Sequence, residues 1–349
     1  MRSDRLLSIR FTHPEPKRSA SPVWPVFLPF AGCPFKCVYC SQYVQTGQRG
    51  SSPSQTAQSM SRRILERFNK TGQPVSLGFF GGTFTAMPLK DILVFLDQAC
   101  SLKKAGAVNH IRCSTRPDCL GQEVLDILEY YGLDMLELGV QSFQDDVLRA
   151  SARGYSSDSA LKACSLVKSR KFELGIQLMP GLPGSGPSQY LRDIKQTANI
   201  VPDVVRLYPC LVLKGTLLEE MLAKGRYRPW SLKSSIALLS RALLTLWQNG
   251  IQVIRTGLAP EPSLINSILA GPWHPALGSI CRSEALKTYI AWNLAKAGKK
   301  VRQVYIPSRY ASDFWGYKGR NSIFYARQEI ARSMVTPWKK DYFQIFFAD

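Results

Sequence analysis

The stretch VFLPFAGCPFKCVYCSQ, residues 26–42, joins an apolar run to three closely spaced cysteines. The apolar run at 26–31 has the length and composition of a buried strand. Five similar runs follow it, at 75–80, 110–115, 134–140, 173–179 and 203–209. Longer amphipathic segments separate these runs, which is typical of strand–helix–strand units. The sequence therefore predicts an α/β fold with six parallel strands, as a sheet covered on both faces or as an incomplete barrel.

Unusual motifs follow the ends of these predicted strands. They are the cysteine segment, GGTFT (81–85), STRPD (114–118), GVQS (139–142) and MPGLPG (179–184). Ligands of parallel α/β folds bind where the strands end and the loops begin. These motifs are therefore expected to meet at one edge of the sheet and to form one site.

Three cysteines directly follow the first predicted strand. Cys33, Cys37 and Cys40 are close enough in sequence for one loop to turn their sulfurs toward a single point. A structural zinc site needs four ligands, whereas an iron–sulfur cluster can use three thiolates and leave its fourth iron open. The spacing favours such a cluster. A zinc site and a chance group of core or redox cysteines are the alternatives.

The composition indicates a globular protein that works in a reducing compartment. The chain has 349 residues, 45% of them hydrophobic, and no apolar stretch approaches the roughly 18 to 20 residues that span a bilayer. Nine cysteines are an odd number in a chain too large to need disulfides. We therefore expect a cytoplasmic protein that does not contact a membrane.

The positive charge is concentrated at the two ends of the chain. The net charge is +20, of which residues 1–73 and 282–349 carry +8 each. Basic ends on a nearly neutral body favour a polyanionic partner, with nucleic acid as the first candidate, and a merely solvated basic surface is the alternative. Four aromatic residues near basic side chains would stack bases or pack the C-terminal region; they are Trp273, Trp315, Tyr317 and Trp338.

Changes in pattern along the chain suggest three parts. Residues 1–22 form a basic N-terminal segment, residues 23–260 the α/β core, and residues 261–349 a basic, aromatic-rich region. Within the core, two helical segments after about residue 215 are followed by a possible further strand, IQVIRTG, at 251–257.

The cysteine spacing, with Tyr39 directly before the last cysteine, resembles the signature of the radical S-adenosylmethionine (SAM) superfamily. The resemblance implies a partial (β/α)6 TIM-like barrel and a [4Fe-4S] cluster on Cys33, Cys37 and Cys40, with SAM at the open iron. It implies that one electron splits SAM into methionine and a 5′-deoxyadenosyl radical, which abstracts hydrogen from a substrate. Tyr39 would contact the adenine, and a reductant such as flavodoxin or ferredoxin would supply the electron.

The same resemblance makes two later motifs candidates for SAM contacts. Gly81, Gly82 and Thr83 would let the backbone approach the methionine amine, because glycine permits close approach. A plain strand-to-helix turn is the alternative. Arg116 ends the third strand, where its guanidinium would hold the cofactor carboxylate. A surface arginine before a proline turn is the alternative.

Polar residues inside the predicted sheet complete the expected cofactor site. Glu137, Gly139 and Gln141 alternate along the fourth strand, so they share one face. Buried polar groups need partners, and a ligand for Gln141 explains its position better than packing does. The remaining expected cofactor contacts are Ser114, Arg153, Gln177 and Met179.

Over about residues 26–230 the chain resembles the radical domain of the Elongator catalytic subunit. The resemblance is carried by LELGVQSFQDDVLRASARGY (136–155) and RLYPCLVLKGTLLEEM (206–221). It implies modification of the wobble uridine of transfer RNA (tRNA), with Tyr208 and Lys214 as catalytic residues. The sequence shows no acetyltransferase segment after residue 230, as in shorter bacterial relatives, so an acetyl-CoA-dependent step is left open.

Two other functions remain open on the sequence. The same radical chemistry on a small metabolite, such as a tetrapyrrole precursor, would need no nucleic acid. A non-catalytic nucleic-acid-binding protein would use the cluster for structure alone.

Overall fold

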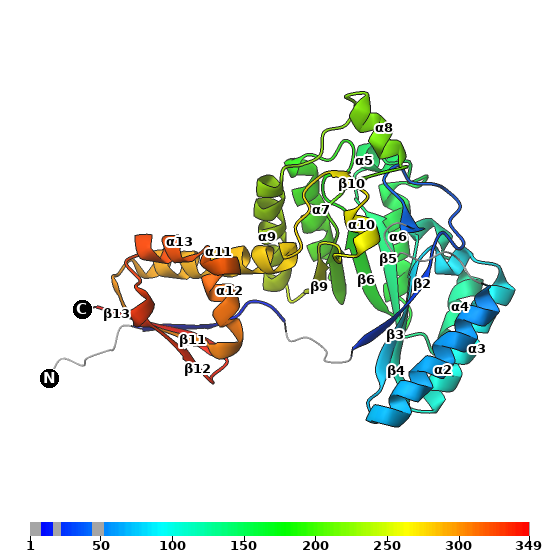
Figure 1. Ribbon diagram of the computed structural model, residues 1–349, viewed down its shortest axis with the longest axis horizontal. Coiled ribbons are helices and arrows are strands. Elements are labelled where there is room, and N and C mark those ends of the chain that lie inside the picture. Colours follow the sequence, from blue (N-terminus) through cyan, green and yellow to red (C-terminus); the bar gives the residue numbers. More distant parts are fainter. Residues whose placement is uncertain (1–7, 17–21, 44–51, 349) are drawn as a thin grey trace.

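A computed structural model describes residues 8–16, 22–43 and 52–348. Its largest element is a seven-stranded sheet in which all neighbouring strands run parallel. The sheet curls into an incomplete barrel (Figure 1). In spatial order the strands are β2 (Val23–Leu28), β3 (Val75–Gly81), β4 (Val108–Thr115), β5 (Met135–Gln141), β6 (Glu173–Leu178), β7 (Val204–Leu207) and β9 (Gln252–Thr256).

Amphipathic helices pack their apolar faces against this sheet. Helix α2 (Pro53–Thr71) begins at Ser52, whose hydroxyl accepts a hydrogen bond from the backbone N–H of Gln55, and it ends at Gly72 in the left-handed conformation. The other helices of this layer are α3 (Leu89–Lys104), α4 (Gln122–Tyr130), α5 (Asp145–Ala150), α6 (Ser157–Lys168), α7 (Pro187–Ile200) and α9 (Leu232–Gln248). Their buried side chains join those of the strands in one core cluster.

The predicted α/β class and incomplete barrel are confirmed, with two differences in the strands. The first strand covers Val23–Leu28 instead of 26–31, because the chain turns after Leu28, where Pro29 has no N–H for a sheet hydrogen bond. The possible strand at 251–257 is β9, which pairs with β7 and makes the barrel seven-stranded instead of six-stranded.

A second, smaller sheet brings the two basic ends of the chain together. Its order is β1 (Ser8–Thr12), β13 (Tyr342–Phe347), β11 (Val301–Pro307) and β12 (Val335–Trp338). Strand β1 pairs antiparallel with β13, so a strand from the predicted N-terminal segment lies within the C-terminal sheet. The predicted domain boundaries stay predictions.

One long helix connects the barrel to the smaller sheet. Helix α11 (Leu277–Ala297) packs against α9 of the barrel and against α12 (Ala311–Trp315) beside the smaller sheet (Figure 1). On α11, Arg282 makes ion pairs with Glu15 and with Asp313, the latter at 3.1 Å. Within the described ranges, no helix has both the length and the apolar character that a membrane span requires.

Candidate functional site

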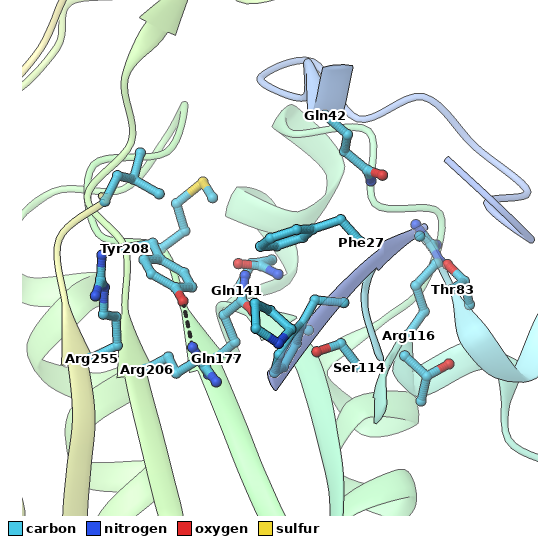
Figure 2. A pocket seen from close by; sticks show the side chains of 18 of the residues that line it. Phe27, Gln42, Thr83, Ser114, Arg116, Gln141, Gln177, Arg206, Tyr208 and Arg255 are labelled. Carbon is cyan, nitrogen blue, oxygen red and sulfur yellow. Dashed lines mark hydrogen bonds between the residues drawn. The ribbon is translucent and has the colours of Figure 1, made fainter. Parts of the chain in front are cut away.

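A cavity of about 960 Å³ lies inside the barrel, and its lining extends from the amino ends to the carboxyl ends of the strands. Figure 2 shows polar side chains from several strands that point into it. All seven strands contribute to its lining, with Phe27, Phe80, Arg112, Gly139, Gln177, Arg206 and Ile254 as examples. Cavities of roughly 300–1,000 Å³ are typical of small-molecule and cofactor sites.

The loop after β2 carries the three cysteines, and Cys33, Cys37 and Cys40 all line this cavity. The backbone N–H of Val38 donates to the carbonyl of Ser151 at 3.3 Å, and the Val38 carbonyl accepts from the N–H of Leu218 at 2.8 Å. The side chains of Val38 and Leu218 are buried in one apolar cluster. The position of the cysteine loop is therefore set by packing and by backbone hydrogen bonds.

Glycines let the cysteine loop and the turn after β3 touch backbone to backbone. A Cβ atom on Gly32 would lie 2.3 Å from the Thr83 carbonyl oxygen, and one on Gly82 would lie 2.1 Å from the Ala31 carbonyl oxygen. The N–H of Thr83 donates to the same Ala31 oxygen at 2.7 Å. Gly81, Gly82 and Thr83 line the cavity as expected, but the close approach that requires glycine is between these two loops.

Two arginines surround the sulfur of Cys37. Arg153 is buried and donates from Nη1 to Cys37 Sγ at 3.1 Å and to the Tyr39 hydroxyl at 3.2 Å. Burial alone lowers the pKa of Arg153, but Tyr155, Tyr39 and Cys37 raise it more, so this pKa lies well above its ordinary value. Arg116 donates to Cys37 Sγ at 3.9 Å. Both arginines thus direct a hydrogen-bond donor at the sulfur of Cys37.

The guanidinium of Arg116 has a protein partner of its own. Its Nε and Nη2 each donate at 2.9 Å to one oxygen of Asp118. Arg116 lines the cavity, so it lies where a cofactor carboxylate was expected, yet it already holds a carboxylate of the chain. Its predicted contact with SAM stays a prediction.

Each of the three thiols can supply one ligand to a metal cluster. Burial, together with the nearby Cys37, raises the pKa of Cys40 to about 12, so binding of a metal at Cys40 releases a proton. Among the residues that the structure describes, no three His, Cys, Asp or Glu side chains meet around one point as a single metal ion requires. In a cubane cluster each thiolate binds its own iron, and three thiols that line one cavity meet that requirement.

Gln141 ends β5 in a strained conformation and points into the middle of the cavity (Figure 2). Its φ is +67°, in the left-handed region that side chains other than glycine rarely adopt. The side chain is buried, and its Oε1 has no hydrogen-bond partner among the described residues. A strained residue with an unpartnered buried acceptor fits a ligand that donates a hydrogen bond there.

Sequence reasoning singled out Glu137 but missed the arginines that form a charged network with it. The carboxylate of Glu137 accepts from Arg206 Nε at 2.5 Å and pairs with Arg112 Nη1 at 3.4 Å. Arg206 also donates from Nη1 to the Tyr208 hydroxyl at 2.9 Å, the dashed line in Figure 2. On β4 the polar residues His110, Arg112 and Ser114 alternate with Ile111 and Cys113, and on β7 Arg206 lies between Val205 and Leu207. This alternation was the signal for an inward-facing polar layer.

The structure brings together fourteen of the fifteen predicted site residues. Those that line the cavity are Cys33, Cys37, Tyr39, Cys40, Gly81, Gly82, Thr83, Ser114, Arg116, Gln141, Arg153, Gln177, Met179 and Tyr208. Lys214 is exposed and lies outside the lining, directly after β8 (Val212–Leu213), and its N–H donates to the carbonyl of Ser267 at 2.9 Å. Its predicted catalytic role stays a prediction.

Comparison with protein families gives two adjoining matches. The model described as the radical SAM superfamily matches residues 27–196, and the model described as the radical SAM C-terminal domain matches residues 202–287. The first match begins in β2 and includes the cysteine loop, and together the two matches cover more than half of the chain.

Similar curated proteins carry names that refer to tRNA and to Elongator. A tRNA uridine(34) acetyltransferase of Methanocaldococcus jannaschii is 32% identical over 202 residues, which are 51% of this chain and 37% of that protein. Elongator complex protein 3 of Saccharomyces cerevisiae is 27% identical over 293 residues, which are 70% of this chain and 52% of that protein. The chain spans 37% to 50% of the length of the first three curated relatives.

A solved structure has the same fold. It is the archaeal Elp3 of Methanocaldococcus infernus with an N-terminal deletion, and it matches with a TM-score of 0.58 and 23% identity. The match covers 80% of this chain and 64% of that one.

Proposed function

The chain belongs to the radical SAM superfamily, and we propose that it is a radical enzyme that holds a [4Fe-4S] cluster on Cys33, Cys37 and Cys40 and binds SAM beside it. When bound, the cluster supplies the electron that cleaves SAM into methionine and a 5′-deoxyadenosyl radical. The observation that carries the proposal is the arrangement of three thiols around one cavity, with two guanidinium groups directed at Cys37.

The residues around the cavity have separate tasks in this proposal. Arg153 fixes Cys37 and Tyr39 together, because one guanidinium contacts both side chains. Gln141 offers a buried acceptor to a hydrogen-bond donor of the cofactor or the substrate. The barrel walls surround the reacting groups on several sides, which limits side reactions of a reactive species with water.

We propose further that the substrate is tRNA and that the wobble uridine is modified. The names of the curated relatives and the basic smaller sheet support this assignment. On that sheet Arg10 lies over the ring of Tyr342 at 3.3 Å, and Lys340 lies 4.9 Å from the ring of Trp338. Cations beside aromatic rings on a basic surface suit phosphates and stacked bases.

Cleavage of SAM tests the radical chemistry. The protein is reconstituted anaerobically with iron and sulfide, reduced with dithionite and supplied with SAM, and methionine and 5′-deoxyadenosine are measured. Cys37→Ser should abolish both products. Cys100→Ser, on helix α3 away from the cavity lining, should leave them unchanged and is the matched control. A wild-type protein that binds zinc in place of iron and sulfide and forms neither product would disprove the proposal.

A separate experiment tests the tRNA substrate. Binding of the reconstituted protein to tRNA is measured over a range of salt concentrations, and nucleosides of bulk tRNA from a deletion strain are analysed by mass spectrometry. Affinity that falls steeply with salt, together with an altered wobble uridine, supports the assignment, because phosphate contacts release counterions. SAM cleavage without tRNA binding would instead favour a small-metabolite substrate.

A further inference from the structure

Two arginines, Arg206 and Arg255, line the side of the barrel cavity opposite Arg116. Figure 2 shows Arg206 and Arg255 on one side of the cavity and Thr83 and Arg116 on the other, with Gln141 between them. Arg112 also lines the cavity and shares the carboxylate of Glu137 with Arg206. The cavity therefore has a cysteine side and an arginine side.

Two of the three arginines share one carboxylate, and Arg255 makes no ion pair among the described residues. Glu137 is the carboxylate that contacts Arg112 and Arg206. Of the acidic residues in the lining, Glu173 pairs with His110 at 3.2 Å, and within the described ranges Glu261 makes no ion pair with any of the three arginines. Across a smaller cavity that borders Arg255, Asp313 pairs with Arg282. Three guanidinium groups thus face one directly bound carboxylate.

One of these groups has an unused donor in a buried position. Arg112 is 7% exposed, and its Nε has no hydrogen-bond partner among the described residues. A buried charged donor without a partner is costly, and arginines next to one another repel. Both costs fall when an anion binds.

Gln177, Arg206 and Arg255 lie side by side on the neighbouring strands β6, β7 and β9. Arg206 on β7 lies opposite Gln177 on β6 and opposite Arg255 on β9 in the strand register. Arg255 donates from Nε to the backbone carbonyl of Gly257 at 3.2 Å, and this hydrogen bond is not an ion pair. The Arg206 guanidinium is held by Glu137 and Tyr208, so its orientation is fixed. Planar guanidinium groups match the oxygens of carboxylates and phosphates.

We propose that Arg112, Arg206 and Arg255, with Gln177 beside them, form a binding subsite for an oxyanion of the substrate, either a carboxylate or a phosphate. Arg206 and Arg255 lie across Gln141 from Arg116, whose guanidinium contacts Cys37, so the anion anchors the substrate while its reacting carbon faces the cofactor. The assignment of the anion to the substrate rests on the proposed function. Binding of the anion itself needs neither SAM nor a reductant, so the anion subsite and the proposed function can be refuted separately.

Direct binding measurements test this subsite. The reconstituted full chain, without SAM and dithionite, is titrated by calorimetry with malonate, inorganic phosphate and uridine 5′-monophosphate, and chloride keeps the ionic strength constant. We expect at least one of them to bind, and Arg255→Gln to weaken it by about tenfold, the usual effect of losing one hydrogen bond to a charged group. Arg241→Gln, which removes the same charge from an exposed position on α9, should not change the affinity.

The outcomes separate the two sources of the anion. Preference for malonate identifies a small carboxylate, and preference for phosphate or the nucleotide identifies a nucleotide phosphate. The proposal is overturned if none of the three anions binds, or if Arg255→Gln and Arg241→Gln bind them equally. The double variant Glu137→Gln with Arg206→Gln, which leaves the net charge of the network unchanged, should also weaken binding and serves if Arg255→Gln does not fold.

Discussion

The contact between the cysteine loop and the turn after β3 predicts a large effect of one methyl group. In Gly82→Ala the new Cβ would lie 2.1 Å from the Ala31 carbonyl oxygen and 2.7 Å from the Ala31 nitrogen. Ordinary contact begins at 3.4 Å, so the two backbones must separate by about 1.3 Å. Both obstructing atoms belong to the backbone and cannot rotate away as a side chain can. Overpacking of this kind costs about 1–3 kcal/mol.

The displaced segment carries Cys33, whose sulfur lies 3.4 Å from the Thr83 hydroxyl. We therefore expect Gly82→Ala to lower the free energy of unfolding by about 2 kcal/mol and to reduce the iron and sulfide that the protein retains after anaerobic reconstitution. Chemical denaturation measures the first quantity, and metal analysis of the desalted protein measures the second.

Gly121→Ala is the matched control, because Gly121 has a φ of −121° and nothing lies within 4 Å of its added Cβ. It should change neither quantity. Equal stability and equal iron content of the two variants would refute the claim that Gly82 is required by the contact between these loops.

Three further variants test other contacts of the structure. Asp193→Ala removes a buried carboxylate that accepts three hydrogen bonds from the turn after β5. It should lower the free energy of unfolding, measured by urea denaturation, by about 3 kcal/mol. A change below about 0.5 kcal/mol would contradict the role given to these hydrogen bonds. Arg153→Met should lower the free energy of unfolding by about 3 kcal/mol and reduce the retained iron, because the Arg153 guanidinium donates to Cys37 and to the Gly139 carbonyl on β5. Arg149→Met, on the exposed side of α5, is the control and should change both quantities little. Equal losses in the two variants would show that Arg153 has no special role in holding the proposed cluster. Lys340→Gln should weaken tRNA binding and lower the slope of affinity against salt by about 1, and an unchanged slope would place the RNA elsewhere.

The sequence predicted the barrel and the edge where its motifs meet. Apolar runs with helical segments between them carry local information, and the strands from Val75 to Leu207 lie within two residues of their predicted limits. The motifs met at one cavity because parallel strands end on the same side. Gln141 was found by the same logic, since a polar residue in a covered strand needs a partner.

The pairing of distant strands could not be predicted in this way. Strand β9 follows β7 only after a long segment that contains two helices, and nothing local shows that it returns to the barrel. The arginine side of the cavity was missed for a related reason. Arg206 and Arg255 are far apart in sequence, and only the strand register places them opposite each other.

The pairing of β1 with β13 affects when the chain can fold during its synthesis. Ser8 and Gln344 contact each other across 336 positions of sequence. A ribosome adds about 5–20 residues per second, so roughly 20 to 70 seconds pass before the first strand meets its neighbour. During that interval its backbone groups are open to the wrong partners, and a nascent chain released early would leave this edge uncovered for aggregation.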